Sequence, residues 1–331
     1  MNLKSLLAAL ADGEIHSGEE LALLLNVTRA AVWKRIQQLM ALGIAIEKIH
    51  AKGYRLQHKI SVLDEQQIRS LLPSATSALL ASLDIPFSVA STNAEAMQVA
   101  QMTRSVDTAH IVLAEHQAAG RGRRGKVWQS PVAGNIYLSC AWHYRFGINV
   151  VSGMSVAIGV AVAEALNELF TTDNFKVKWP NDIWWDDHKV AGILIEAQGD
   201  ATSDCTVVIG IGVNVVSKQQ WAEQIAGVKW QTLADIAESE HLPDIDRNRV
   251  AAVLIEAITK VCRDYVQQGI ANYQSRFKKL DALAEREVIV DTAQGLVVAT
   301  AKGIDRQGLL QVECDGVLQS LNAAEVSLRI R

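Results

Sequence analysis

The stretch of sequence with the clearest chemical character is AAGRGRRGKVW, residues 118–128. Gly120, Gly122 and Gly125 have the spacing of the G-x-G-x-x-G fingerprint of dinucleotide-binding folds. That fingerprint needs a helix directly after it and an acidic residue about 20 positions further on. The residues that follow, KVWQSPVAGN, contain Trp, Pro and Gly, and the later stretch CAWHYR holds no acid. We therefore reject a dinucleotide site of that kind.

Four cations lie within six residues of this loop: Arg121, Arg123, Arg124 and Lys126. Like charges at this density repel one another unless an anion binds among them, and backbone N–H groups of a Gly-rich loop can add donors. Guanidinium groups also make bidentate contacts with carboxylates and phosphates. The pattern predicts a loop at the edge of an anion-binding site. A solvated basic loop and a DNA-binding patch stay open as alternatives.

Two further stretches have residue types that suit an anionic ligand. In residues 176–196, KVKWPNDIWWDDHKVAGILIE, polar side chains surround a predicted turn between two apolar strands: Lys178, Asn181, Asp182 and Lys189. Residues 207–215, VVIGIGVNV, form an apolar strand in which Gly210 and Gly212 let a ligand approach the backbone, followed by Asn214. Cations, an amide and a carboxylate at a strand end favour a metal-assisted anionic ligand. Each stretch alone is also compatible with ordinary turn chemistry.

The first 60 residues have the pattern of a winged helix-turn-helix. Leucines at helical spacing predict a first helix, Ser17 and Glu20 predict a capping box at the start of a second, and Thr28 predicts the cap of a third. Two short β-prone stretches, 44–49 and 53–56, predict a hairpin wing. This region holds eight Lys and Arg against five Asp and Glu, although the whole chain has a net charge of -4. A single basic module is therefore expected, and a chain whose whole surface binds nucleic acid is excluded.

The predicted third helix, TRAAVWKRIQQLMALG, is the candidate for reading DNA in the major groove. Its core-facing positions are Ala31, Val32, Ile36 and Leu39. Its outward positions, which we expect to contact DNA, are Thr28, Arg29, Trp33, Lys34 and Gln38. On the wing, the candidates for phosphate or minor-groove contact are Lys48, Lys52 and Arg55. A small helical domain that binds protein instead remains the alternative.

The remainder of the chain alternates strands and helices and then changes to short strands. Residues 61–85 read as a linker that enters a helix and then a loop. Strands are expected at 87–91, 109–117, 135–144, 175–180, 184–198 and 205–215. Helices are expected at 93–101, 152–169 and 248–277. The tail from residue 287 carries Gly turns at regular spacing, which predicts a small β-barrel.

The composition bounds the class of protein. With 331 residues, 49% of them apolar and 21% charged, the chain suits a soluble protein of two or three domains. Its four cysteines are far apart, with no C-x-x-C, which favours free thiols in a reducing compartment over disulfides or a zinc site. Neither a secretory signal nor a membrane span is expected. We expect a cytoplasmic protein.

Taken together, the motifs resemble those of the bifunctional biotin–protein ligases that also repress the biotin operon. The matching stretches are STN at 91–93, QxxGRGRRG at 117–125, the downstream SP and GNIYLS, KVKWPND at 176–182, HKVAGILIE at 188–196 and GIGVN at 210–214. They occur in the family's order and, with the two terminal regions, span almost the whole chain. One strand, CAWHYRFGINV, departs from the family pattern, in a region expected to contact a dimer partner.

The resemblance implies a multidomain α+β fold. It comprises a winged helix-turn-helix DNA-binding domain at residues 1–63, a mixed α/β ligase domain of the class II synthetase kind at 64–276, and an SH3-like β-barrel at 277–331. It also implies a homodimer favoured by ligand, which would place two recognition helices on a palindromic operator. A membrane partner is not expected.

The resemblance also assigns roles to residues. It implies biotin contacts from Ser91, Thr92, Asn93, Gln117, Arg121, Gly122, Arg123 and Lys189. It implies contacts with ATP or the adenylate from Gly120, Arg123, Asn181, Asp182, Lys189, Asn214 and Trp230, the last of these packing on adenine. The catalytic cations would be Lys189, Arg123 and Arg121, with Mg²⁺ arriving with ATP and not held by a protein cluster.

The implied reaction is the activation of biotin by ATP to biotinyl-5′-AMP. The biotin is then transferred to a lysine of a biotin carboxyl carrier protein. The carboxylate and the phosphate are both anions, so the reaction needs cations more than it needs a base. A ligase for lipoate or another acyl acid is the alternative within the same fold, and a DNA-binding sensor that binds biotin without turnover is the alternative of another class.

Overall fold

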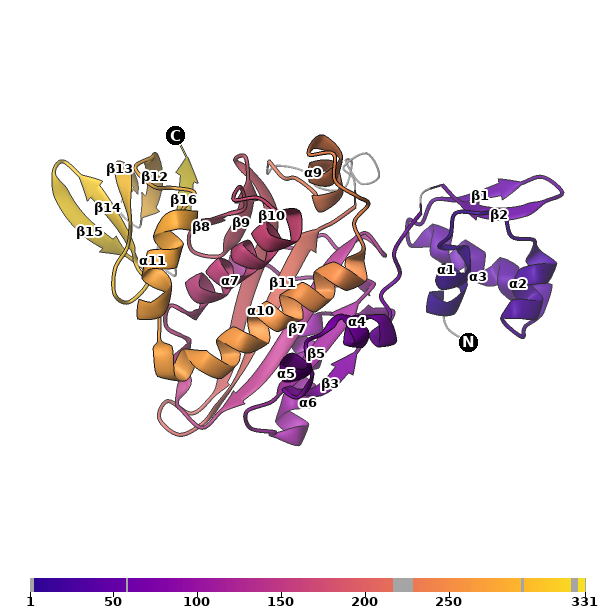
Figure 1. The fold of residues 1–331 in the computed structure, drawn as a ribbon, viewed down its shortest axis with the longest axis horizontal. Helices are drawn as coiled ribbons and strands as arrows, with labels where there is room; N and C mark the ends of the chain where they lie inside the picture. Colours follow the sequence, from indigo (N-terminus) through magenta and orange to yellow (C-terminus); the bar gives the residue numbers. More distant parts are fainter. Residues whose placement is uncertain (1–2, 58, 217–228, 293–294, 323–326, 331) are drawn as a thin grey trace.

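The computed structural model describes residues 3–57, 59–216, 229–292, 295–322 and 327–330. Figure 1 shows three successive parts: a small helical unit at the N-terminus, a central sheet covered by helices, and a small sheet at the C-terminus. The central part holds the largest hydrophobic core. None of the helices within the described ranges is long and apolar enough to cross a membrane.

The N-terminal unit has the predicted three helices and hairpin. Its elements are α1 (Leu3–Leu10), α2 (Gly18–Leu24), α3 (Arg29–Ala41) and the antiparallel strands β1 (Ile46–Ile49) and β2 (Gly53–Leu56). Ser17 and Glu20 form the predicted capping box of α2, and the Thr28 hydroxyl accepts a hydrogen bond from Ala31 N at 3.2 Å. Val32, Ile36 and Leu39 are buried as predicted, whereas Ala31 is only half-buried.

The linker region differs from its prediction. Helices α4 (Glu65–Leu71) and α5 (Ser74–Ser77) follow residue 64, and the segment expected to be a loop forms the strand β3 (Leu80–Asp84). β3 pairs in parallel with β5 (Ala109–Ala114) at the edge of the central sheet. Its sequence, LASLD, has little intrinsic β-propensity and buries only Leu83, so the pairing with β5 is what makes it a strand.

The central sheet has the strand order β3-β5-β7-β11-β10-β9-β8, and every neighbouring pair except β3 and β5 is antiparallel. The remaining strands are β7 (Asn135–Tyr144), β8 (Lys176–Lys178), β9 (Asp182–Trp185), β10 (His188–Gly199) and β11 (Cys205–Asn214). The predicted strand 184–198 is therefore wrong, because the chain reverses at Asp186 and Asp187, which have φ values of 44° and 61°. Two successive positive φ angles are typical of a two-residue hairpin turn.

A further correction concerns the predicted strand 87–91. Only β4 (Ser88–Val89) pairs there, in parallel with β6 (His116–Gln117), in a separate two-stranded sheet. Helix α6 (Thr92–Thr103) begins directly after Ser91 and packs through Ala96 and Ala100 on the sheet face formed by Val112, Ala141 and Val208.

The opposite face of the sheet is covered by α7 (Met154–Phe170) and α10 (Arg247–Gln268), as Figure 1 shows. The helix predicted at 248–277 is in fact two helices, α10 and α11 (Ala271–Leu280). They are separated at Gly269, where φ is +58°, a conformation that ends a helix. The short helix α9 (Leu233–Ser239) precedes them.

A fully buried ion pair ties the linker to the central part. Arg247 Nη1 lies 2.7 Å from a carboxylate oxygen of Glu115, and both side chains are at most 2% exposed. Glu115 accepts a hydrogen bond from Leu63 N at 2.7 Å, and Arg247 donates one to the carbonyl of Ser61 at 2.8 Å. The N-terminal unit is also packed against the central part, because Val132 and Ala133 belong to its hydrophobic cluster.

The C-terminal part forms an antiparallel sheet in the order β15-β14-β13-β12-β16. Its strands are β12 (Glu287–Thr292), β13 (Gly295–Ile304), β14 (Leu310–Cys314), β15 (Val317–Leu321) and β16 (Ser327–Ile330). The short strands predicted for the tail are thus present. Val288, Val290, Ala301 and Leu310 continue the central hydrophobic core into this sheet.

Candidate active site

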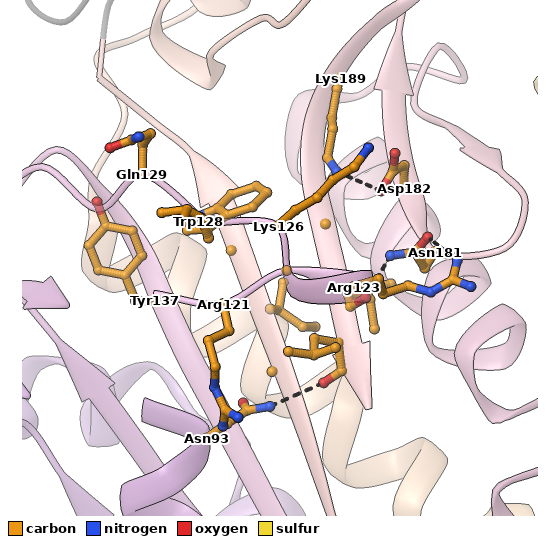
Figure 2. A pocket seen from close by; sticks show the side chains of 18 of the residues that line it. Asn93, Arg121, Arg123, Lys126, Trp128, Gln129, Tyr137, Asn181, Asp182 and Lys189 are labelled. Atoms are coloured by element: carbon orange, nitrogen blue, oxygen red, sulfur yellow. Dashed lines mark hydrogen bonds and ion pairs between the residues drawn. The ribbon is translucent and has the colours of Figure 1, made fainter. Parts of the chain in front are cut away.

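A cavity of about 440 Å³ opens between the loop 118–128 and strands β8 to β11 of the central sheet (Figure 2). Every ligand-site residue predicted from the sequence lines this cavity except Gly120. Segments that are far apart in the chain therefore converge, because the antiparallel pairing of β10 with β11 and β9 brings Gly212 and Asp182 to either side of Gly192.

One end of the cavity is a network of neutral polar side chains. The Ser139 hydroxyl donates to Asn93 Oδ1 at 2.6 Å and lies 2.8 Å from the Thr92 hydroxyl. Gln117 Oε1 accepts from Thr92 N at 2.9 Å, and Gln117 Nε2 donates to the Ser130 hydroxyl at 3.1 Å. Because these groups are already oriented by one another, this end can recognise a compact ligand that carries both donors and acceptors.

Gly210 is required beside this network. A Cβ atom at position 210 would lie 2.9 Å from Asn93 Cγ and would collide with its Oδ1. The glycine of β11 therefore lets Asn93 approach the sheet. The sequence singled out the glycine, but it did not single out Ser139, whose only sequence signal was its place in the GNIYLS motif.

The other end of the cavity is cationic. Lys189 Nζ lies 2.7 Å from Asp182 Oδ1, and Arg123 Nη1 donates to Asn181 Oδ1 at 3.0 Å. Burial lowers the pKa of Lys178; Lys189 and Lys126 lower it further, whereas Asp182 opposes the shift. Burial also lowers the pKa of Arg123, with Arg124 adding to the effect and Asp182 opposing it. Neighbouring cations make one another's protonated forms less stable, and a bound anion would stabilise those forms.

The loop 118–128 is a small closed hairpin. Gly122 N donates to Lys126 O at 2.7 Å, and Trp128 N donates to Gly120 O at 3.0 Å. A single 3-10 turn, Arg123–Gly125, forms the tip, so no α-helix opens after the glycines and the rejection of the dinucleotide fingerprint is confirmed. A Cβ atom at Gly120 would collide with Trp128 O, so Gly120 serves the close approach of the two hairpin strands and lies outside the cavity lining.

Trp128 covers the sheet in the middle of the cavity. Gly192 and Gly212 are paired across β10 and β11, and a Cβ atom at Gly212 would collide with the Trp128 indole ring. Lys189 Nζ lies 5.3 Å from the centroid of that ring. The Trp128 Nε1 atom is buried and has no hydrogen-bond partner among the described residues, so it is available as a donor to a ligand. This side chain was considered from the sequence only as a neighbour of the loop.

Asn214 and Trp230 are held beside the backbone of Lys189. Lys189 N donates to Lys229 O at 2.9 Å, and Gln231 N donates to Lys189 O at 2.9 Å, which places Trp230 next to Lys189. Asn214 Nδ2 lies 3.4 Å from the same carbonyl. Most of the polar stretch that precedes Trp230, residues 217–228, lies outside the described residues.

Comparisons with known proteins agree with this arrangement. Residues 88–214 match the biotin/lipoate A/B protein ligase family, residues 2–55 match a helix-turn-helix domain, and residues 285–329 match the biotin protein ligase C-terminal domain. The bifunctional ligase/repressor BirA of Salmonella typhimurium is 38% identical over 325 residues, which cover 98% of this chain and 97% of that protein. The chain belongs to the bifunctional biotin ligase/repressor family.

More distant proteins are also similar to this chain. BirA of Bacillus subtilis is 28% identical over 96% of this chain and 95% of that protein. The structure of biotin protein ligase from Aquifex aeolicus in complex with biotin and ATP superposes with a TM-score of 0.62 at 22% identity, covering 76% of this chain and all of that chain. This likeness shows a mixed α/β ligase fold.

The residues predicted to contact DNA lie on the N-terminal unit, away from the cavity lining. Arg29, Lys34 and Lys52 are exposed, and the Trp33 side chain is 55% exposed on α3. The Thr28 hydroxyl is exposed but already caps the helix. In a family of ligase/repressors, an exposed aromatic and cationic helix face is an appropriate surface for DNA.

Proposed function

We propose that this ligase/repressor joins biotin to ATP to give biotinyl-5′-AMP and pyrophosphate, and then transfers biotin to a lysine of a biotin carboxyl carrier protein. The observation that carries the proposal is the division of one cavity into a neutral polar end and a cationic end. The neutral end, with Ser91, Thr92, Asn93 and Gln117, suits the biotin ring system. The cationic end suits the carboxylate and the phosphates.

In the first step a carboxylate oxygen of biotin attacks the α-phosphorus, and the bond from that phosphorus to the bridging oxygen of pyrophosphate breaks. Both reactants are anions, so Arg123 and Lys189 lower the barrier by neutralising charge as they approach. Asn181, Asn214 and Trp230 would hold the nucleotide, and Gly120 would shape the loop beside it. Gly122 and Arg121 would close the loop over biotin.

In the second step the amine of the acceptor lysine attacks the acyl carbon of the adenylate. A new amide bond forms, the bond from the acyl carbon to the phosphate oxygen breaks, and AMP leaves with its negative charge while the lysine nitrogen loses a proton. The loop 118–128 excludes water from the reactive adenylate until the lysine arrives.

Mg²⁺ fits the site only together with ATP. Within the described ranges, no group of three or more His, Cys, Asp or Glu side chains could hold a metal ion. Asp182 is the acidic side chain of the described cavity lining, and a single carboxylate plus phosphate oxygens is a usual ligand set for Mg²⁺. When bound there, the ion would neutralise phosphate charge.

The test is transfer of labelled biotin to a purified acceptor domain in the presence of ATP. Labelled acceptor that withstands denaturation is expected, and absence of transfer refutes the ligase. Lipoate is run in parallel, because the matching family model also covers lipoate ligases. Transfer of lipoate in place of biotin would reassign the substrate. Biotin binding without adenylate formation would identify a sensor.

We propose that the adenylate-bound form dimerises and represses the biotin operon by binding a palindromic operator through Thr28, Arg29, Trp33, Lys34 and Lys52. A gel shift on such a site, with and without biotin and ATP, tests this. Binding that is indifferent to both ligands would refute ligand control.

We also propose domain limits of 1–63, 64–276 and 277–331. The central domain would have a class II synthetase-like fold and the last domain would be an SH3-like barrel. We propose a cytoplasmic location for the protein.

A further inference from the structure

Glu196 is an acidic residue placed against an anion-binding loop. It lies on β10, outside the lining of the cavity. Its Oε2 atom accepts hydrogen bonds from Arg121 Nη2 at 3.0 Å and from Asn93 Nδ2 at 2.8 Å. A carboxylate in this position weakens the attraction of Arg121 for a phosphate, because it already neutralises the guanidinium charge. Glu196 therefore needs a role other than anion binding.

The loop 118–128 is fastened to the sheet at two points. Arg121 is bound by the Glu196 carboxylate at the neutral end of the cavity, whereas Arg123 at the cationic end donates to Asn181 Oδ1 at 3.0 Å and interacts with the charge of Asp182. A phosphate that enters the cationic end therefore meets Arg123, while Arg121 stays on Glu196. Figure 2 shows the two arginines directed to opposite ends of the cavity, Arg121 toward Asn93 and Arg123 toward Asn181.

The same carboxylate oxygen also fixes the neutral end of the cavity. Asn93 is 5% exposed, and its amide is oriented by Glu196 on the nitrogen side and by Ser139 on the oxygen side. Glu196 thus joins the movable loop to the residues that are proposed to bind the biotin ring.

We propose that Glu196 is a positioning residue that seats the loop 118–128 over the biotin end of the cavity through Arg121 and so keeps Arg121 away from the phosphate. This rests on the proposed ligase function. Three consequences follow. Loss of the Glu196 charge raises the KM and Kd for biotin and lets biotinyl-adenylate escape faster, while the KM for ATP stays constant.

The competing view, in which Arg121 is itself a phosphate ligand, requires the opposite. In that case Glu196→Gln frees Arg121 for ATP, so the KM for ATP falls and adenylate formation accelerates. The two views therefore differ in which substrate responds and in the sign of the response.

The experiment uses the full chain with four variants: Glu196→Gln, Arg121→Ala, their combination, and Gln198→Ala. Gln198 is the matched control, because it is exposed and lies two residues further along β10. Among the residues that the structure describes, its side chain forms a hydrogen bond only with Gln101 on α6. Biotin affinity is measured by calorimetry without ATP, and both KM values by pyrophosphate exchange. Calorimetry measures the effect of each substitution on biotin binding even if the wild-type chain transfers no biotin. Absence of transfer would refute the proposed function separately.

For Glu196→Gln we expect a three- to fivefold weaker affinity for biotin, which corresponds to the upper end of the free energies of half-exposed ion pairs. The KM for ATP should be unchanged, and the thermal unfolding midpoint should stay close to that of the wild type. In the Arg121→Ala background, the same substitution should change the logarithm of the Kd for biotin by less than half as much. A lower KM for ATP, or an effect of full size in both backgrounds, overturns the proposal.

Discussion

Replacing Lys189 by Ala tests the charge argument at the centre of the site. Lys189 Nζ lies 2.7 Å from Asp182 Oδ1, and its side chain is 23% exposed. At an effective dielectric constant of about 20, a unit charge attracts a phosphate charge about 4 Å away by about 4 kcal/mol. Without the ammonium this attraction is lost, and the Asp182 carboxylate faces the phosphate uncompensated. At about 1.4 kcal/mol for each factor of ten, biotin activation should fall about a thousandfold.

Biotin-dependent exchange of labelled pyrophosphate into ATP measures this step without an acceptor protein. Lys279→Ala is the control, because Lys279 is an exposed residue in the last turn of α11 and lies outside the cavity lining; exchange should be unchanged. The thermal unfolding midpoint of Lys189→Ala should stay within a few degrees of the wild type, since the lost side chain is partly exposed. Exchange within tenfold of the wild type would refute the assignment.

Three further substitutions follow from particular contacts. Gly210→Ala should raise the KM for biotin about tenfold or more and leave the KM for ATP unchanged, because its Cβ displaces Asn93; enzyme kinetics on each substrate check this. Arg247→Met should lower the free energy of unfolding by about 3–5 kcal/mol, measured in urea, because it leaves the Glu115 charge buried and unpaired. Burial raises the pKa of Asp281 to about 6, against a hydrogen bond from Leu283 N that lowers it. Its contribution to stability is therefore complete below about pH 4 and is lost as the pH rises through about 6, so Asp281→Asn should raise the thermal unfolding midpoint at pH 8 but not at pH 4.

Controls separate these effects from general damage to the fold. Gly18→Ala, where the nearest neighbour of the added Cβ is 3.7 Å away, should leave both KM values unchanged. Adding Glu115→Leu to Arg247→Met should restore part of the lost stability, and no recovery would count against the buried charge as the cause. For Asp281, an equal effect of the substitution at both pH values would rule out its titration as the source.

The sequence by itself determined the local elements whose signals are short in range. The pair Ser17 and Glu20 specified the start of α2, and a mostly apolar run with Ile136, Tyr137, Trp142 and Tyr144 indicated β7. It also determined most of the ligand site, since every residue that it implied to contact biotin or ATP, except Gly120, reached one cavity. Glycine and charge at fixed spacing are informative because some backbone conformations and close approaches accept only glycine, and few buried environments accept a charge.

Only the tertiary structure decided features that depend on partners distant in the chain. LASLD became β3 through its pairing with β5, and the Asp186–Asp187 turn became a hairpin through the register of β9 with β10. The partner of Arg121 could not be read from the sequence, because Glu196 is 75 residues away and resembles any other acidic residue. Hydrogen bonds and ion pairs depend on distance in space, and the sheet that brings these residues together is set by all of its strands at once.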